Sequence, residues 1–155
     1  MKNNTYWLPD YNRPIIAFDW DQTISINGHD MHAVAISLFE YLKNLGYLPV
    51  VISGRYPKEP VISTYEPNIT IHKNPEMERF TQTYNPIRFK IWVLNYYKRK
   101  GDLIFYVDGD IKTVSILKDA GIPVINLRTQ ALTEWQNLIN FWIKFFVDRK
   151  RKINK

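Results

Sequence analysis

The chain has 155 residues, of which 45% are hydrophobic and 15% aromatic, and it contains no cysteine. This length predicts one domain with a substantial hydrophobic core, and this composition excludes a disordered protein. The lack of cysteine excludes disulfide bonds and thiolate metal sites. Because residues 1–14 lack the apolar core of a signal peptide and no stretch is long and apolar enough for a membrane span, we expect a soluble cytoplasmic protein.

The net charge of +6 is concentrated at one end of the sequence. Residues 144–155 contain six Lys or Arg residues and one acid, Asp148, so they carry +5 and the rest of the chain carries only +1. Such a basic tail can contact nucleic-acid phosphates, but a solvated tail that only aids solubility is an equal alternative. The charge therefore describes the tail and says little about any cleft.

An acidic block follows the first predicted strand. Ile15–Phe18 is a short apolar run, typical of a strand buried on both faces of a parallel sheet. Asp19 and Asp21 come next and can share one side of the chain while Trp20 faces away, because side chains alternate along extended backbone. One carboxylate can ligate a hard cation and attack an electrophile while the other transfers a proton. The alternative is an ordinary turn, which Asp and Thr23 also favour.

A helix and a second strand complete a βαβ unit. Apolar residues recur at helical spacing from about Asp30 to Leu45, Gly46 is a natural C-cap, and Tyr47–Ile52 reads as a buried strand. The interval is too short for an inserted domain. Ser53-Gly54-Arg55 then ends the strand with groups that can bind an anionic oxygen, although Gly also makes ordinary turns.

Residues 56–86 contain five prolines that interrupt any long helix. Short strands at 61–64 and 69–72 and a short helical piece at 76–80 fit the pattern. The segment is either a rim facing the substrate or a packed surface excursion.

The second half of the sequence continues the α/β alternation. A helix is predicted from Pro86 to about Lys100, and Lys90 near its start works against the helix dipole, so it is either partnered by an anion or simply exposed. The run Leu103–Val107 reads as a strand ending in Asp108-Gly109-Asp110. Asp-Gly often marks a mere turn, but this is the third apolar strand ending in polar groups, which favours a site.

The remaining elements are a helix over Ile111–Asp119, a strand over Val124–Leu127 and a last helix over 133–147. Thr133 and Gln136 form a capping box for the last helix. Six apolar residues at helical spacing predict its buried face: Trp135, Leu138, Ile139, Trp142, Ile143 and Phe146. We therefore predict a single domain with a core at about 14–127, this C-terminal helix, and a basic tail at 148–155.

The motifs together resemble a known family. With Asp19-Trp20-Asp21-Gln22-Thr23 followed by Ser53, Lys90 and Asp108, residues 14–127 resemble the haloacid dehalogenase superfamily of phosphohydrolases. The quartet 52–55 and the 18-residue step from Lys90 to Asp108 look like the phosphatase domain of phage-type polynucleotide kinase/phosphatases. The resemblance implies an α/β, Rossmann-like three-layer sandwich with a central parallel sheet and no large cap domain.

The resemblance also implies roles for individual residues. Asp19 would be the nucleophile that forms an aspartyl-phosphate, and Asp21 the general acid and base. The phosphate-binding set would be Thr23, Ser53, Gly54, Arg55 and Lys90. Mg²⁺ would be bound by Asp19, the main-chain carbonyl of Asp21, and Asp108, with Asp110 in support. The sequence departs from the family pattern at Gln22, where many members have Gly, and in the spacing of Asp108 and Asp110.

We therefore expect a Mg²⁺-dependent phosphatase that acts on a nucleotide or a nucleic-acid terminal phosphate, with nucleic acid as a possible partner of the basic tail. One alternative is a phosphatase for mononucleotides or other small metabolites, with residues 56–86 as a lid. A second alternative is a non-catalytic module that keeps the fold and binds nucleic acid or a partner. Retention of both Asp19 and Asp21 argues against the module.

Overall fold

The computed structural model describes residues 8, 10–20, 23–25, 31–53, 70–72, 86–126 and 132–153. Strands and helices alternate along these residues. In chain order they are β1 (Ile15–Phe18), α1 (Ala33–Asn44), β2 (Leu48–Ser53), β3 (Thr70–His72), α3 (Pro86–Lys100), β4 (Leu103–Asp108), α4 (Ile111–Asp119), β5 (Val124–Asn126) and α5 (Leu132–Ile153).

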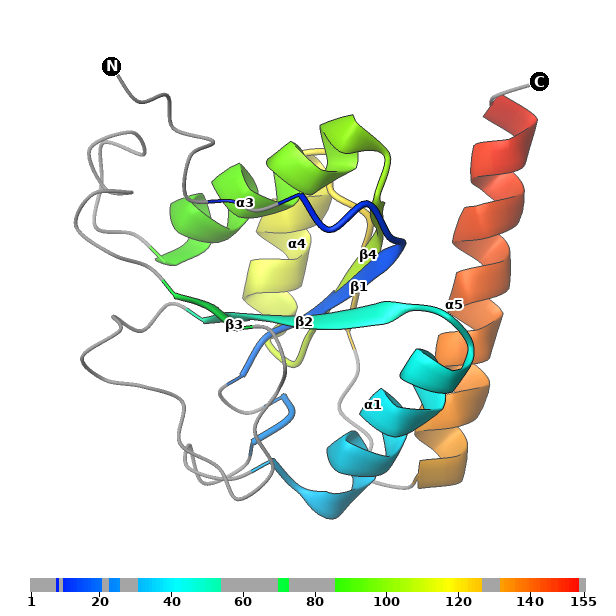
Figure 1. The fold of residues 1–155 in the computed structure, drawn as a ribbon. Coiled ribbons are helices and arrows are strands. Elements are labelled where there is room, and N and C mark those ends of the chain that lie inside the picture. The colour runs from blue at the N-terminus through cyan, green and yellow to red at the C-terminus, as the bar shows by residue number, and fades with distance from the viewer. Residues whose placement is uncertain are drawn as a thin grey trace.

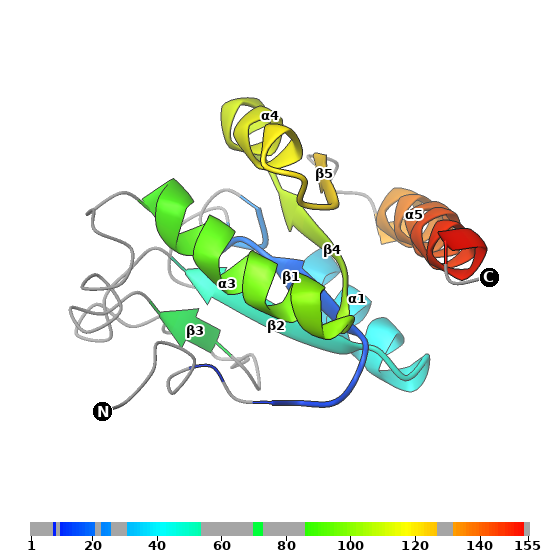
Figure 2. The same cartoon turned by 90° about the horizontal axis from the view of Figure 1, so that it is seen from above.

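The five strands form one parallel sheet in the order β3-β2-β1-β4-β5, with β1 at its centre. Helices α3 and α4 cover one face of the sheet, and α1 and α5 cover the other (Figure 1, Figure 2). The expected Rossmann-like three-layer sandwich is therefore confirmed. The interval from 19 to 47 between β1 and β2 contains α1 and connecting residues, which leaves no room for a large cap domain there.

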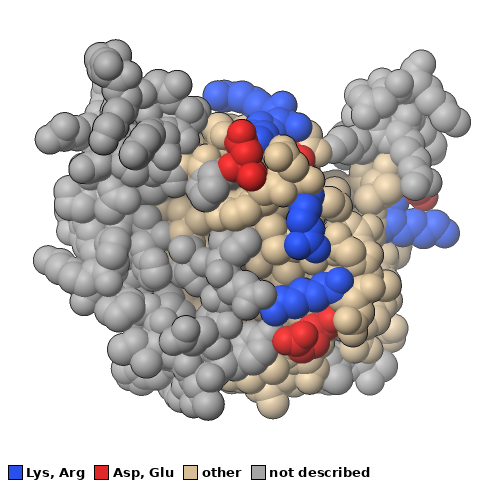
Figure 3. Space-filling model, in the orientation of Figure 1, with Lys and Arg blue, Asp and Glu red and all other residues tan. Residues whose placement is uncertain are grey.

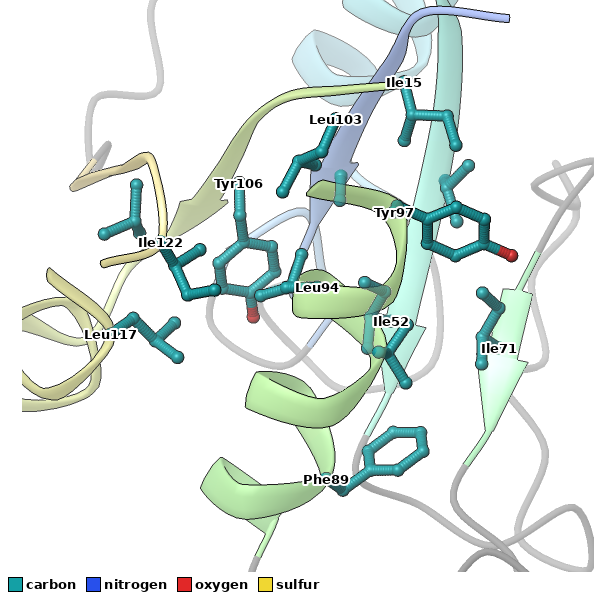
Figure 4. Close-up of a cluster of buried hydrophobic side chains, with 14 of the residues drawn as sticks. Ile15, Ile52, Ile71, Phe89, Leu94, Tyr97, Leu103, Tyr106, Leu117 and Ile122 are labelled. Carbon is teal, nitrogen blue, oxygen red and sulfur yellow. The ribbon is translucent and has the colours of Figure 1, made fainter. Parts of the chain in front are cut away.

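Side chains of β1 alternate between two hydrophobic cores. Ala17 belongs to the cluster under α3 and α4, which Figure 4 shows. Phe18 belongs to the cluster under α1 and α5, and its ring centroid lies 4.9 Å from that of Phe39 in α1. Trp20 continues the alternation past the strand end, because it is buried in the cluster under α1 and α5. Asp19 is therefore directed to the face covered by α3 and α4.

The pairing of β4 with β1 contains one irregularity. Ile15 pairs with Leu103, but the next residue of β1, Ile16, pairs with Phe105, so that Ile104 is an extra residue in β4. Ile104 and Phe105 both lie in the cluster under α1 and α5, as expected where a β-bulge interrupts the alternation.

The bulge decides which face the last residue of β4 occupies. Beyond it the register is regular and Tyr106, aligned with Ala17, lies in the cluster under α3 and α4. Because alternate residues share a face, Asp108 lies on that side too. If the side chains of β4, including Ile104, alternated regularly from Leu103 onward, Asp108 would face α1 and α5.

The bounds of α3 and α4 are those expected from the sequence, and β3 falls in the expected strand at 69–72. The possible strand at 61–64 and the helical piece at 76–80 lie outside the described residues. The described part of the last expected strand is Val124–Asn126, and residue 127 lies outside the described residues.

The expectation for the C-terminal helix was wrong in two respects. Helix α5 runs to Ile153 and includes most of the basic residues expected to form a separate tail, because Lys and Arg are good helix formers and are favoured near a helix C-terminus. Leu138 is not part of its buried face, since 41% of its surface is exposed. Among the described residues, no helix has the length and apolar character needed to span a bilayer.

Candidate active site

One lysine joins the two central strands at their carboxyl ends. Asp19 directly follows β1, Asp108 ends the neighbouring β4, and Lys90 reaches both from α3. The Lys90 Nζ donates to Asp19 Oδ1 at 2.7 Å and to Asp108 Oδ2 at 3.4 Å. All three residues are buried. The structure thus brings together three residues that are 71 and 18 positions apart in the sequence and that were predicted to share a site.

The position of Lys90 follows from the amphipathic character of α3. Phe89, Val93 and Leu94 are buried against the sheet, and Lys90, beside Phe89, lies on the margin of this face in the first turns of the helix. A cation at a helix N-terminus is electrostatically unfavourable. The two carboxylates offset this cost, so the anionic partner considered from the sequence is present.

Thr23 connects the loops that follow β1 and β4. Its Oγ1 donates to Asp19 Oδ2 at 3.1 Å and accepts from the backbone N–H of Gly109 at 2.9 Å. A hydroxyl has only one proton to donate. In this structure that proton goes to Asp19, so the side chain of Thr23 orients the carboxylate that was expected to be the nucleophile.

His32 supports Thr23 from the start of α1, and no motif in the sequence pointed to it. Its Nδ1 accepts from the backbone N–H of Ala35 at 3.1 Å and so caps the helix. The ring proton therefore lies on Nε2, which is 3.2 Å from the carbonyl oxygen of Thr23 and donates to it. Burial lowers the pKa of His32, which favours this neutral form, although the bond to Thr23 opposes the shift.

Tyr106 is a second residue that was missed. Its hydroxyl donates to Asp108 Oδ2 at 2.8 Å, and its ring is buried between Leu94 of α3 and Ile122 (Figure 4). Burial and, to a lesser degree, the charges of Asp19 and Asp108 raise its pKa well above the usual value, so it stays a hydrogen-bond donor. Its place two residues before Asp108 on one strand was the signal for it.

The carboxylate of Asp108 is also fixed on its other oxygen. Oδ1 accepts from the backbone N–H of Asp110 at 2.8 Å, and the backbone carbonyl of Asp108 accepts from Asn126 Nδ2 at 2.9 Å. Asp108 is 1% exposed. Its two oxygens therefore have fixed directions before any ligand arrives.

Asp110 performs a different task from Asp108. It is the N-cap of α4, and its Oδ2 accepts from the backbone N–H of Thr113 at 3.1 Å and from Thr113 Oγ1 at 2.6 Å. These bonds to Thr113 lower the pKa of Asp110. The carboxylate expected to support a metal is thus turned towards the helix that it caps.

The remaining predicted residues divide into two groups. Ser53 ends β2 at the same edge of the sheet and is buried, and in the parallel pairing it is aligned with His72 of β3. Asp21, Gly54 and Arg55 lie outside the described residues. Their assignments as acid/base and phosphate-binding groups stay predictions.

The site carries two buried acids and one buried base. Burial raises the pKa of the Asp19 carboxyl to about 6 against the opposing effect of Lys90, and the charge of Asp108 adds to the rise. For Lys90, burial acts to lower the pKa, but the two carboxylates outweigh it and the pKa lies above the usual value. Lys90 therefore stays charged, and the ionised site has one negative charge in excess among these three side chains.

Two carboxylates with fixed oxygens suit a hard divalent cation. Mg²⁺ is commonly held by one or two carboxylates, with water and substrate phosphate as its other ligands. Within the described ranges, no group of three or more His, Cys, Asp or Glu side chains is arranged to hold a metal ion. The fit thus depends on Asp19 and Asp108, which already share one cation in the ammonium of Lys90.

Comparisons of this chain with family models, curated proteins and solved structures found no match. The chemical capability of the site follows from its own side chains. It presents a carboxylate held in a fixed direction, beside a buried cation and a second carboxylate, at the edge of the sheet where α/β folds bind ligands. This arrangement suits nucleophilic attack on an anionic centre.

The hydrogen bond from Tyr106 should contribute to stability. We expect Tyr106→Phe to lower the free energy of unfolding by about 1–3 kcal/mol, because the ring is kept while a buried bond to a charged group is lost. Urea denaturation would measure this change in the free energy of unfolding. Tyr41→Phe is the matched control, since the hydroxyl of Tyr41 bonds to Asn140 at the surface, and it should change stability by less. Equal effects of the two substitutions would contradict the buried bond.

The raised pKa of Asp19 predicts a pH dependence of stability in metal-free protein. Between the ordinary Asp pKa of 3.8 and the folded value of about 6, the folded state holds a proton that the unfolded chain has lost. The free energy of unfolding should therefore fall as the pH rises through this window. In EDTA, Asp19→Asn should remove this fall and be the more stable protein above pH 6, by on the order of 2 kcal/mol. If the free energies of unfolding of the unmodified chain and of Asp19→Asn changed in parallel from pH 4 to 7, the raised pKa of Asp19 would be contradicted.

Proposed function

We propose that the chain is a Mg²⁺-dependent phosphomonoesterase of the haloacid dehalogenase superfamily. The observation that carries the proposal is the contact of Lys90 with both Asp19 and Asp108. The family pattern calls for a nucleophilic Asp after the first strand, a Lys at a helix start and an acid at the end of a neighbouring strand. Here these three side chains lie in contact at the carboxyl edge of the sheet.

In the first half-reaction, an oxygen of Asp19 attacks the phosphorus atom of the substrate. The bond between phosphorus and the ester oxygen breaks, and Asp21 gives its proton to the departing oxygen. The alcohol leaves and Asp19 carries the phosphoryl group as a mixed anhydride. Thr23 directs the attack, because its bond to Oδ2 fixes the plane of the carboxylate.

In the second half-reaction, Asp21 takes a proton from water, whose oxygen attacks the phosphorus. The bond to Asp19 breaks, inorganic phosphate leaves, and both acids return to their starting states. General acid and base transfer of this kind contributes about 10²–10⁴-fold. The largest part of the work is to position the phosphoryl group and neutralise its charge.

The ammonium of Lys90 has three N–H donors, two of which go to carboxylates in the described structure. The third can bind a phosphoryl oxygen. Asp19 and Asp108 are the side chains that would hold Mg²⁺, and the ion would supply further neutralisation of the phosphoryl charge. Tyr106 keeps Asp108 oriented for this role.

The substrate class is a nucleotide or the terminal phosphate of a nucleic acid. Support comes from the quartet 52–55 and the spacing of Lys90 and Asp108, which resemble polynucleotide phosphatase domains. The interval between β1 and β2 is too short for a large cap domain, which favours a substrate as large as a polymer end.

The first experiment removes the nucleophile. Asp19→Asn should lower turnover of an aryl phosphate by roughly 10³-fold or more, because the amide cannot replace the attacking oxygen. The fold should persist, since Lys90 keeps Asp108 as a partner. Release of phosphate and circular dichroism are the measurements. A variant with near-normal turnover would exclude Asp19 as the nucleophile.

The second experiment compares the two acids after β4. Asp108→Ala should raise the Mg²⁺ concentration needed for half-maximal rate, whereas Asp110→Ala should leave it nearly unchanged and cost about 1 kcal/mol of stability as a lost N-cap. Mg²⁺ titrations of the rate, paired with urea denaturation, separate these effects. The reverse order would show that Asp110 is the metal ligand.

A further inference from the structure

Helix α5 has an apolar face that is turned away from the core. Its inner side buries Trp135 and Ile139, while Leu138, Phe141 and Phe145 are 41%, 59% and 41% exposed. These three residues follow one another at i, i+3 and i+7, so they form one stripe on the helix. We call this stripe the aromatic face of α5. A contiguous exposed apolar stripe of this kind often marks a site of interaction.

The rings of the aromatic face are held in place by neighbours. Phe141 and Phe145 each contact the half-buried Trp142 edge-to-face, with ring centroids 5.2 and 5.4 Å apart. Trp142 stacks on Phe146 at 5.7 Å, and Phe146 in turn stacks on Phe105 of β4 at 5.5 Å. The exposed rings are thus the outer end of an aromatic cluster anchored in the sheet. Little rotamer freedom is left for a ligand to remove.

Positive charge continues the same stripe. Lys144, between Phe141 and Phe145 in the sequence, is exposed beside this stripe, and α5 runs on to Ile153. Arg149 and Lys152 follow Phe145 at i+4 and i+7, which are the positions that extend a helical stripe. Figure 3 shows basic charge on α5 at the right edge of the molecule, apart from that at the end of α3. Residues 144–155 hold +5 of the net charge of +6.

This surface is distinct from the candidate active site. Helix α5 begins near the site, where Trp135 contacts His32, and runs alongside α1, where Asn140 bonds to Tyr41 (Figure 1). It therefore leads away from the carboxyl edge of the sheet. At about 1.5 Å per residue, Arg149 is roughly 20 Å further along the helix than Trp135.

We propose that the aromatic face and basic end of α5 bind single-stranded nucleic acid. Bases would stack on Phe141 and Phe145 while backbone phosphates contact the basic residues. Charge complementarity favours this occupant, because a polyanion neutralises the +5 segment, whereas a second copy of the chain would add more positive charge. A duplex hides its bases and offers only its phosphates. This binding goes beyond the proposed catalysis and does not depend on it.

The test is fluorescence anisotropy with the full chain in EDTA, using a labelled oligothymidylate without a terminal phosphate and a duplex of the same length. Neither probe is a substrate, so the result is independent of phosphatase activity. The single strand should bind more tightly. Phe141→Leu and Phe145→Leu keep an apolar side chain but remove the ring, and each should weaken single-strand binding by roughly tenfold. Duplex binding should be nearly unaffected.

Two controls belong to the experiment. Ile111→Ala on α4 removes another exposed apolar side chain, 63% exposed, and should leave binding unchanged. A variant with Gln at Arg149, Lys150, Arg151 and Lys152 should bind both probes more weakly, and the salt dependence of its binding should be flatter. Circular dichroism checks that α5 is retained, and Phe145→Tyr, which restores a ring, should restore binding.

Several results would overturn the proposal. If the Leu variants bind the single strand as the unmodified chain does, the rings are not a stacking platform and only the charges act. Equal affinity of the unmodified chain for single strand and duplex would likewise show that only the charges act. A concentration-dependent dimer in sedimentation that Phe141→Leu dissolves would assign the face to a second copy. Binding to phosphatidylserine vesicles without binding to the oligonucleotide would assign it to a lipid surface.

Discussion

The rest of the site depends on one buried interaction, the contact of the Lys90 ammonium with two carboxylates on neighbouring strands. Asp19 and Asp108 could not both be ionised at this depth without a cation, since an unpaired buried charge costs several kcal/mol. Lys90 meets this need and fixes α3 against β1 and β4 at the same time. Two acids still share one base. The resulting excess of negative charge would attract a second cation.

This interaction in turn depends on which way the strands present their side chains. Asp19 reaches Lys90 because β1 alternates regularly, and Asp108 reaches it because the bulge at Ile104 shifts the alternation of β4 by one residue. Thr23 and Tyr106 then fix individual oxygens of the two carboxylates. The sheet supplies the approximate positions, and these hydroxyls supply the directions.

Much of this was predictable from the sequence. Hydrophobic periodicity and the Pro and Gly residues at element ends were enough to place α3 and α4. The order of polar groups at strand ends and at a helix start was enough to select Asp19, Lys90 and Asp108. These signals are local in the chain. The exposure of Leu138 was not predictable, because periodicity shows that a stripe is apolar but not how wide a stripe the core can cover.

Tyr106 and Asp110 illustrate two further limits. The place of Tyr106 two residues before Asp108 puts both side chains on one face, but which face that is depends on a bulge that no residue pattern predicts. Asp110 carried a signal for its cap as well as for a metal, since Asp directly before a helix is a preferred N-cap residue. His32 likewise acts through two backbone groups, and contacts with backbone leave little trace in side-chain patterns.

The bulge in β4 has a consequence for how the chain can vary in length. Ile104 can be lost without moving the acid, because Leu103 and Phe105 would then be consecutive and would pair with Ile15 and Ile16 in regular alternation, with Asp108 still on the side of Lys90. Beyond the bulge the same loss has the opposite effect. A deletion of one residue between Phe105 and Asp108 would turn Asp108 into the layer of α1 and α5, away from Lys90. Strand β4 can therefore shorten by one residue only where its alternation is already interrupted.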